Sequence, residues 1–294
     1  MISAELRKQI KKLQLKAGHE VTDMLTGDYI SAFKGRGMEF DEVRGYNPGD
    51  DVRTIDWNVS ARMGEPYIKV FKEEREMTLM LLLDVSRSQY FGSTQRQKIE
   101  IAAELAAVLA FLAINNNDRV GVVLFSDHVE QFIPPQKGRA HIWNIIRSVL
   151  SHEPQGTSTN LSEALETLLK FKSKRSLCFL ISDFLADGYE QKMKQVASRH
   201  DLVCVQIDDP REREWVDSGL IALKDSESGR SFWFDSGDRQ LRQQLVQQSA
   251  RKRENLEALA KQGAFDFMSL GTDESIVDGL SEVFRRRGKR RRKS

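Results

Sequence analysis

The stretch "LMLLLDVSRSQ", from Leu79 to Gln89, places five consecutive apolar residues directly before a carboxylate, with hydroxyls two and four residues later. A continuous apolar run of this length is typical of a strand buried on both faces, as in a parallel sheet covered by helices. An ionised carboxylate that is buried without a partner costs several kcal/mol or takes up a proton. We therefore expect a compensating group beside Asp84, where this strand ends.

The residues after this strand alternate between helical and strand-like patterns. The apolar residues of the next segment recur at helical spacing, at Ile99, Ala102, Ala106, Leu109 and Ala113. Further helices are expected at about 139–151, 160–172, 188–199 and 238–262, with a last one capped near Thr272 or Asp273. The strand-like runs are "DRVGVVLFS", "VEQFIPP", "RSLCFLISDF", "DLVCVQIDD" and "AFDFMSL". This alternation predicts an α/β fold with a doubly wound, mainly parallel sheet and helices on both faces, and the two prolines of "VEQFIPP" favour a sheet edge.

The composition is that of an ordinary globular protein. The chain has 294 residues, of which 40% are hydrophobic and 30% charged, which is enough for one large or two modest domains. No apolar stretch approaches the roughly 18 residues of a membrane span, and the charged amino terminus does not resemble a secretory signal, so we expect a cytoplasmic protein. Cys178 and Cys204 lie in strand-like runs and are expected to be free core residues.

The chain divides into three regions. Residues 1–75 are expected to form an N-terminal amphipathic helix, at about 3–26, followed by a small β-containing flange. Residues 76–284 form the α/β domain, with a β-hairpin near 219–235. Residues 285–294, "RRRGKRRRKS", form a basic tail that we expect to be disordered and dispensable for folding. Because this tail holds eight basic residues and the whole chain has a net charge of +2, the rest carries about −6.

Oxygen-bearing side chains follow three of the predicted elements. "DVSRS" ends the first core strand, "GTSTNLSEAL" precedes a helix, and "SDF" ends the strand "SLCFLISD". In an open parallel sheet, such pieces meet at the carboxyl ends of the strands, where ligands bind. The side chains concerned are Asp84, Ser86, Ser88, Thr159 and Asp183. Hard oxygen donors of low total charge suit a small hard cation, so the sequence predicts a Mg2+ site, with Mn2+ as an alternative.

The same three pieces resemble a known metal site. D-x-S-x-S, a threonine before N-x-x-E-A-L, and an aspartate ending a later strand are similar to the metal-ion-dependent adhesion site of von Willebrand factor A domains. The resemblance implies that Ser86, Ser88 and Thr159 bind the metal directly or nearly so, and that Asp84 and Asp183 bind it directly or through water. Thr157 is a rival for the threonine position; the spacing from Thr159 to Ala164 favours Thr159.

A second resemblance covers most of the chain. "GRGMEFDEVRGYNPGDDVRTIDWNVSAR", "KVFKEERE", "DDPREREW" and "GLIALKDSESG" resemble the bacterial domain-of-unknown-function family fifty-eight. The resemblance implies a von Willebrand factor A-like fold with an amino-terminal flange. It also implies a frequent functional association with MoxR-type AAA+ ATPases.

The flange residues allow two interpretations. Ion pairs and packing by Arg44, Asp50, Asp51, Arg53, Asp56, Trp57 and Arg62 would lock the flange to the α/β core. Alternatively, Trp57, Arg53 and Arg62 bind a partner, because Trp and Arg are favoured as interface anchors.

Three classes of function remain open. The first is a metal-dependent protein-interaction module, an adaptor that captures an acidic residue of a partner, such as a MoxR-type ATPase or its client, on Mg2+. The second is a Mg2+-dependent phosphoryl-transfer enzyme with Asp84 as nucleophile; against it, Ser86 replaces the second carboxylate of the common D-x-D motif. The third is binding of nucleic acid or an anionic surface by the basic tail. No nucleotide-binding glycine motif or other catalytic constellation is recognised, so we expect a protein that is not an enzyme.

Overall fold

The computed structural model describes residues 23–33, 39–72, 76–156, 158–171, 175–224 and 229–293. The predicted helix at 3–26 lies outside these residues except for its last four positions. Those positions belong to α2 (Asp23–Phe33), which continues beyond the predicted end.

A six-stranded sheet forms the centre of the domain. Its spatial order is β10 (Asp266–Gly271), β7 (Asp201–Asp208), β6 (Leu177–Ser182), β3 (Thr78–Asp84), β4 (Arg119–Phe125) and β5 (Val129–Gln136). All neighbours are parallel except β5, which pairs antiparallel with β4. The predicted α/β fold with a mainly parallel, doubly wound sheet is confirmed. The two prolines lie in the edge strand β5, as expected, although the strand continues past them to Gln136.

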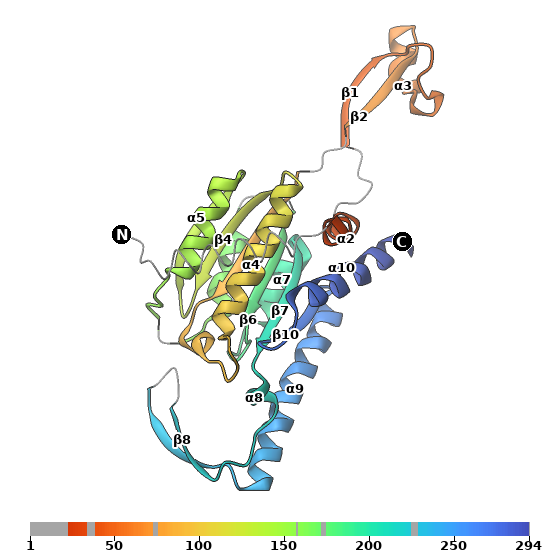
Figure 1. Cartoon of the computed structure of the whole chain (residues 1–294). Coiled ribbons are helices and arrows are strands. Elements are labelled where there is room, and N and C mark those ends of the chain that lie inside the picture. The colour runs from red at the N-terminus through yellow and green to blue at the C-terminus, as the bar shows by residue number, and fades with distance from the viewer. Residues whose placement is uncertain are drawn as a thin grey trace.

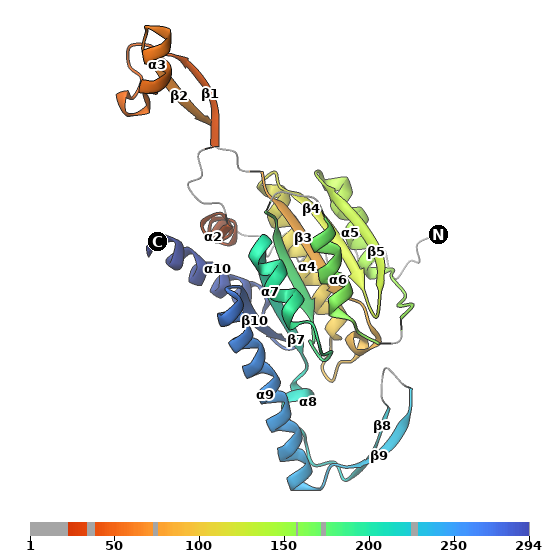
Figure 2. The same cartoon turned by 180° about the vertical axis from the view of Figure 1, so that it is seen from behind.

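Helices cover both faces of this sheet (Figures 1 and 2). One face carries α2, α4 (Lys98–Asn115), α5 (Arg139–Leu150) and α10 (Ile276–Lys293). The other carries α6 (Leu161–Lys170), α7 (Glu190–Arg199) and the second half of α9 (Arg239–Gly263). The four helices predicted after residue 138 are confirmed to within two residues at each end. The last helix begins at Ile276 and not near Thr272, because the Thr272 backbone N–H and hydroxyl donate to Asp208 and Asp209.

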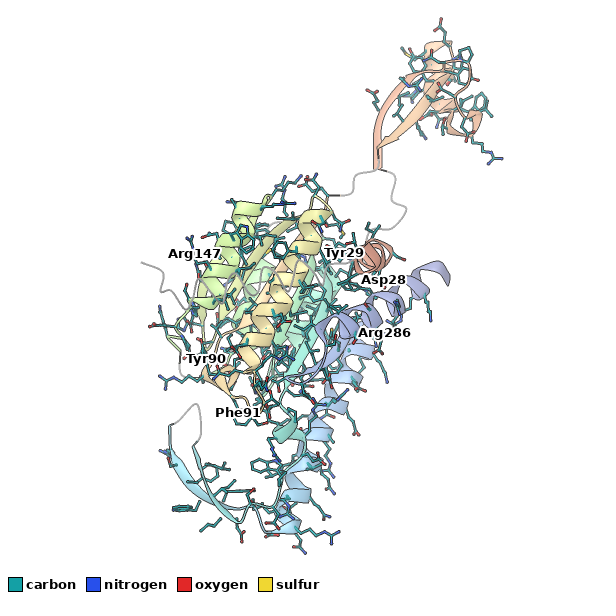
Figure 3. All side chains as sticks on the ribbon, viewed as in Figure 1. Asp28, Tyr29, Tyr90, Phe91, Arg147 and Arg286 are labelled. Carbon is teal, nitrogen blue, oxygen red and sulfur yellow. The ribbon has the colours of Figure 1, made fainter. Side chains whose placement is uncertain are left out.

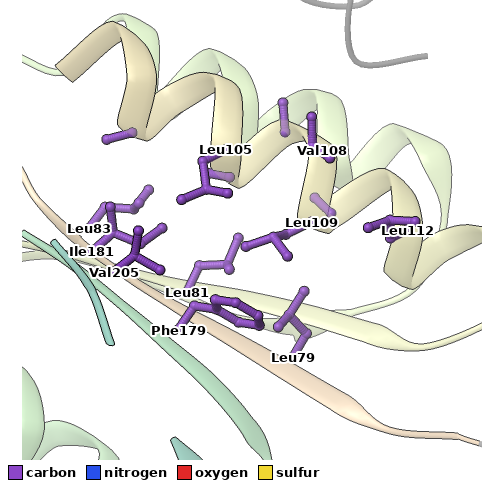
Figure 4. Close-up of a cluster of buried hydrophobic side chains, with 14 of the residues drawn as sticks. Leu79, Leu81, Leu83, Leu105, Val108, Leu109, Leu112, Phe179, Ile181 and Val205 are labelled. Atoms are coloured by element: carbon purple, nitrogen blue, oxygen red, sulfur yellow. The ribbon is translucent and has the colours of Figure 1, made fainter. Parts of the chain in front are cut away.

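The central strand β3 is apolar at every position from Leu79 to Leu83 because helices cover both of its faces. Leu79, Leu81 and Leu83 point toward α4, where Leu105 and Leu109 meet them (Figure 4). Met80 and Leu82 point to the opposite face and join the cluster under α6 and α7. Alternate residues of a strand face opposite sides of the sheet, so a strand covered on both sides must be apolar at every position. Cys178 and Cys204 are buried and free, as predicted.

Two projections extend from the domain at opposite ends of the sheet (Figures 1 and 2). The predicted flange is present: β1 (Glu39–Gly45) pairs antiparallel with β2 (Tyr67–Lys72), with η1 (Val52–Thr54) and α3 (Trp57–Met63) between them. At the other end, residues 214–224 and 229–250 form what we call the arm. It contains the predicted hairpin, with β8 (Leu220–Lys224) and β9 (Ser231–Asp235), and the first half of α9. The short helix α8 (Pro210–Arg213) connects β7 to the arm.

The prediction of a disordered basic tail is wrong for its described residues. Helix α10 continues to Lys293, and its arginines pair with acidic residues of the domain. Arg285 contacts Asp28, and Arg287 contacts both Asp266 and Asp201. Asp28 on α2 and Arg286 on α10 are labelled in Figure 3. The basic helix packs on the domain because carboxylates of the acidic remainder of the chain lie beside it and form ion pairs with its arginines.

None of the described helices has the length and apolar character that a bilayer crossing requires.

The packing of α10 predicts that the basic residues stabilise the domain. The Arg287 side chain is 14% exposed, bridges Asp201 and Asp266, and lies over the Phe33 ring, so Arg287→Ala removes both charge and packing. We expect a loss of about 1 to 3 kcal/mol in the free energy of unfolding, measured in urea. Arg290→Ala is the matched control: its side chain is mostly exposed, and about 0.5 kcal/mol or less is expected. A chain ending at Phe284 that unfolds at the wild-type urea concentration would contradict this account.

Candidate metal site

Asp84 ends β3 and organises the turn after it. One carboxylate oxygen, Oδ1, accepts the Ser86 backbone N–H at 2.9 Å, which bends the chain into η2 (Arg87–Tyr90). The other, Oδ2, accepts the Ser182 hydroxyl at 2.6 Å and the Gln89 amide at 3.4 Å. The Asp84 side chain is fully buried, so both of its oxygens are used within the protein.

The two serines of the turn connect β3 to β6. The Ser86 and Ser88 hydroxyl oxygens lie 3.1 Å apart, and Ser88 Oγ donates to Asp183 Oδ2 at 2.8 Å. Asp183 directly follows β6, the neighbour of β3 in the sheet. The structure therefore brings together four of the five predicted residues, Asp84, Ser86, Ser88 and Asp183, and all four are buried.

Thr159 lies at the same edge of the sheet but outside this network. The backbone N–H of the next residue, Asn160, donates to the Ser126 carbonyl at 2.7 Å, which holds the loop at the end of β4. Asn160 also caps α6 through its side chain. Within the described residues, no hydrogen bond joins Thr159 to the other four. The rival Thr157 lies outside the described residues.

Two buried carboxylates, Asp84 and Asp183, lie close together at this edge of the sheet. Burial, together with the nearby charge of Asp183, raises the pKa of Asp84 to about 7, while hydrogen bonds from Ser182 and Ser86 oppose the rise. Two adjacent carboxylates in a dry environment destabilise each other's ionised form. A positive charge at this edge would therefore stabilise the ionised pair.

A lysine that the sequence analysis did not select supplies one such charge. Lys98, the first residue of α4, is 1% exposed, and its Nζ lies 2.9 Å from Asp183 Oδ2 and 2.7 Å from Glu212 Oε1. Burial alone would lower the pKa of Lys98, but the charges and hydrogen bonds of Asp183 and Glu212 outweigh burial and raise it. A cation in the first turn of a helix opposes the helix dipole. A lysine at the start of this helix was therefore the feature of the sequence that could have indicated a role for Lys98.

The residues at this edge fit a small hard cation. Ser86 and Ser88 offer hydroxyl oxygens, Asp183 offers a carboxylate, and Asp84 would act directly or through water, which is the oxygen chemistry that Mg2+ prefers. The buried Gln89 Oε1 has no hydrogen-bond partner, which leaves an additional oxygen acceptor beside Asp84. No group of three or more His, Cys, Asp or Glu side chains arranged for a metal occurs among the described residues, so hydroxyls are essential to any site here.

The flange residues lie far from this edge. Trp57 is 71% exposed on α3, and Arg53 and Arg62 are also exposed. The flange ion pairs that the structure describes, Arg44 with Asp50 and Lys69 with Asp56, join flange residues to each other. In the described part of the chain they do not lock the flange to the core, so that interpretation is wrong for these pairs.

The structure defines the class of protein: an α/β domain with a mainly parallel sheet covered by helices on both faces, and an amino-terminal flange. The chain belongs to the family described as "Protein of unknown function DUF58", which matches residues 42–255.

Relatives in mycobacteria extend the likeness over nearly the whole chain. It is 30% identical over 293 residues to the proteins Mb1516 of Mycobacterium bovis and Rv1480 of Mycobacterium tuberculosis, covering 98% of this chain and 90% of theirs. The Bacillus subtilis protein YeaD is 30% identical over 105 residues, which are 36% of this chain and 24% of YeaD.

The solved structures that match this chain are more distant in sequence. An aerotolerance-related membrane protein from Bacteroides fragilis has a TM-score of 0.49 and 16% identity, covering 71% of this chain and 99% of the other. BatB from Bacteroides thetaiotaomicron has a TM-score of 0.47 and 17% identity, covering 72% and 99%. The SpRpn10 VWA domain has a TM-score of 0.42 and 12% identity, covering 72% and 95%.

The buried carboxylate pair predicts a pH-dependent effect of Asp84→Asn in chelator. Because the pKa of Asp84 is raised to about 7 in the folded chain, the wild type loses stability as the pH rises from about 4 to 7. Asparagine carries no such charge, and Gln89 can offer Oε1 to its amide. We expect Asp84→Asn to melt above the wild type at pH 8, with the difference shrinking at pH 5. A difference that grows toward low pH would contradict the burial of two interacting carboxylates.

Proposed function

We propose that this protein is a metal-dependent protein-interaction module that binds a partner's carboxylate through Mg2+ at the carboxyl edge of β3 and β6. The partner class that the family resemblance implies is a MoxR-type AAA+ ATPase or the client of one. The observation that carries the proposal is the buried hydrogen-bonded set of Asp84, Ser86, Ser88 and Asp183. Mn2+ would suit the same oxygen donors.

The chemistry of the donors supports binding rather than catalysis. When bound, the ion supplies an electrophilic centre that a carboxylate from another protein can coordinate. Ser86 and Ser88 are neutral ligands, so they leave the ion more of its positive charge than carboxylates would. Asp84 orients the turn that presents both serines, and Ser182 holds Asp84 in place.

The surroundings of this edge provide apolar surface for a partner. Tyr90 and Phe91 follow the site at the end of the domain that faces the arm (Figure 3). On the arm, Leu220, Phe232 and Trp233 are exposed, Trp233 to 71%. An isolated two-stranded ribbon is marginally stable in water, and exposed aromatic residues are typical of interaction surfaces.

Asp84 is poorly placed for the alternative role of a phosphoryl-accepting nucleophile. Its side chain is fully buried, Oδ1 accepts a backbone N–H and Oδ2 accepts the Ser182 hydroxyl. An attacking oxygen would have to give up these bonds and reach an external phosphate. The geometry therefore favours a structural role in orienting the serines.

The basic tail is also less suited to nucleic acid than its sequence implies. Arg285, Arg287 and Arg290 are paired with Asp28, Asp201 and Asp266. These carboxylates would compete with phosphates for the same guanidinium groups. Partner binding by Trp57, Arg53 and Arg62 remains a second proposal, and it concerns a surface at the opposite end of the sheet.

The metal proposal predicts a rise in melting temperature with Mg2+ or Mn2+, because a ligand that binds only the folded state stabilises it by mass action. Asp84→Ala, Ser88→Ala and Thr159→Ala are expected to abolish or weaken the rise, measured by calorimetry against chelator. Ser162→Ala, in the first turn of α6, is the control and should keep the full response. Unchanged metal responses in both Asp84→Ala and Thr159→Ala would rule out the assigned ligands.

The partner proposal predicts that capture of a MoxR-type ATPase depends on a divalent ion. Chelator should release the partner, whereas moderate salt should only weaken binding. Thr159→Ala should reduce affinity without unfolding the domain, since the residue lies in a loop and is half-buried. Trp57→Ala distinguishes the two surfaces. If the wild type binds the partner equally well in Mg2+ and in chelator, and Trp57→Ala does not bind it, the partner docks on the flange.

A further inference from the structure

Lys98 occupies a position in which a charged side chain needs a specific reason. Fully buried lysines are rare unless they are paired, and this one begins a helix whose dipole disfavours a cation there. Its ammonium group contacts two carboxylates from distant parts of the chain, Asp183 after β6 and Glu212 in α8. The residue therefore joins the edge of the sheet to the segment that leads into the arm.

Each carboxylate that holds Lys98 also has a second task. Asp183 Oδ2, which accepts from Lys98, accepts the Ser88 hydroxyl as well, so the ammonium acts on the same oxygen as a candidate metal ligand. Glu212 Oε1 accepts from Lys98, while Oε2 accepts the Asp209 backbone N–H at 3.0 Å and closes the capping box of α8. Glu212 is 30% exposed, whereas Asp183 is 2% exposed.

We propose that Lys98 is the resident cation of this edge, which neutralises Asp183 in the absence of a divalent ion and shifts toward Glu212 when such an ion binds. This inference rests on the metal site proposed above and adds the residue that sets its affinity. Two cations beside one carboxylate repel each other, so a divalent ion bound at Asp183 pushes the Lys98 ammonium away from that carboxylate. Glu212 receives it because it is already within hydrogen-bond distance.

The arrangement gives the domain a way to stay folded without metal. Asp84 and Asp183 would otherwise be two buried carboxylates whose charges only a bound ion could balance. With Lys98 in place, the carboxyl edge tolerates both states, and metal affinity is lower than the carboxylates alone would give. Glu212 lies in α8, the segment that connects β7 to the arm.

The first variant for testing this proposal is Lys98→Met, which removes the charge and keeps an unbranched chain of similar length. Binding of MgCl2 and MnCl2 is measured by isothermal titration calorimetry at fixed pH and ionic strength. We expect the dissociation constant for Mg2+ to fall by about tenfold relative to the wild type. We also expect the melting temperature in chelator to fall, because the two aspartates have lost their resident cation.

The second variant, Glu212→Gln, should change metal binding in the opposite direction. The substitution removes the negative charge of the alternative partner but keeps an oxygen that accepts the Asp209 N–H. The Lys98 ammonium therefore stays beside Asp183, where it repels a divalent ion. We expect the dissociation constant for Mg2+ to rise several-fold. Lys192→Met, which breaks a partly exposed pair with Glu166 between α6 and α7, is the control and should bind Mg2+ as the wild type does.

Opposite shifts in Lys98→Met and Glu212→Gln support the proposal, since a purely structural role would lower the stability of both variants without separating their metal affinities. If the wild type binds Mg2+ and Lys98→Met binds it equally or more weakly, the inference about Lys98 is wrong and the metal site stands. If the wild type binds neither ion, both the metal site and the role of Lys98 are wrong. If Lys98→Met does not fold, Glu212→Gln decides: unchanged or tighter binding overturns the proposal.

Discussion

Two carboxylates buried at the ends of neighbouring strands impose the main constraint on this structure. Asp84 and Asp183 follow β3 and β6, and neither can reach bulk water. The polar groups bonded to them make that burial tolerable, among them the Ser86 N–H and the Ser182 hydroxyl at Asp84, and the Ser88 hydroxyl and the Lys98 ammonium at Asp183. The start of α4 and the position of α8 follow from this requirement, because Lys98 begins the first and Glu212 lies in the second.

The fold was predictable from sequence because its strongest signals are local. The continuous apolar strands and the helical stripe after residue 98 each reflect packing on one element, and both are confirmed. The tail was misjudged because eight basic residues were considered without the acids that face them. Asp28 and Asp201 are 257 and 86 residues away from their arginine partners in the sequence, so no local pattern indicates the pairs.

The same distinction applies to the candidate site. D-x-S-x-S and the aspartate after β6 are visible as motifs, and the parallel sheet brings them together. Lys98 is separated by 85 residues from Asp183 and by 114 from Glu212, and it stands next to the apolar stripe of its helix. Only the three-dimensional structure identifies it as part of the edge. Thr159 illustrates the reverse case: its motif is clear, yet the loop is held through its neighbour Asn160 and not through the threonine itself.

Charge at the carboxyl edge connects these observations to the kind of partner it would bind. With a divalent ion, Lys98, Glu212 and the two buried aspartates, the formal charges at this edge sum to zero, because Glu212 contacts Lys98 directly at 2.7 Å. An incoming carboxylate would still be attracted at short range to the divalent ion that it coordinates, whereas a basic group would be repelled by that ion. The Tyr90–Phe91 turn lies at the end of the domain that faces the arm, and both the turn and the arm carry exposed apolar side chains (Figure 3). The combination favours a partner segment in which an acidic residue is flanked by apolar side chains, because the carboxylate alone would leave the exposed aromatic residues of the arm in water.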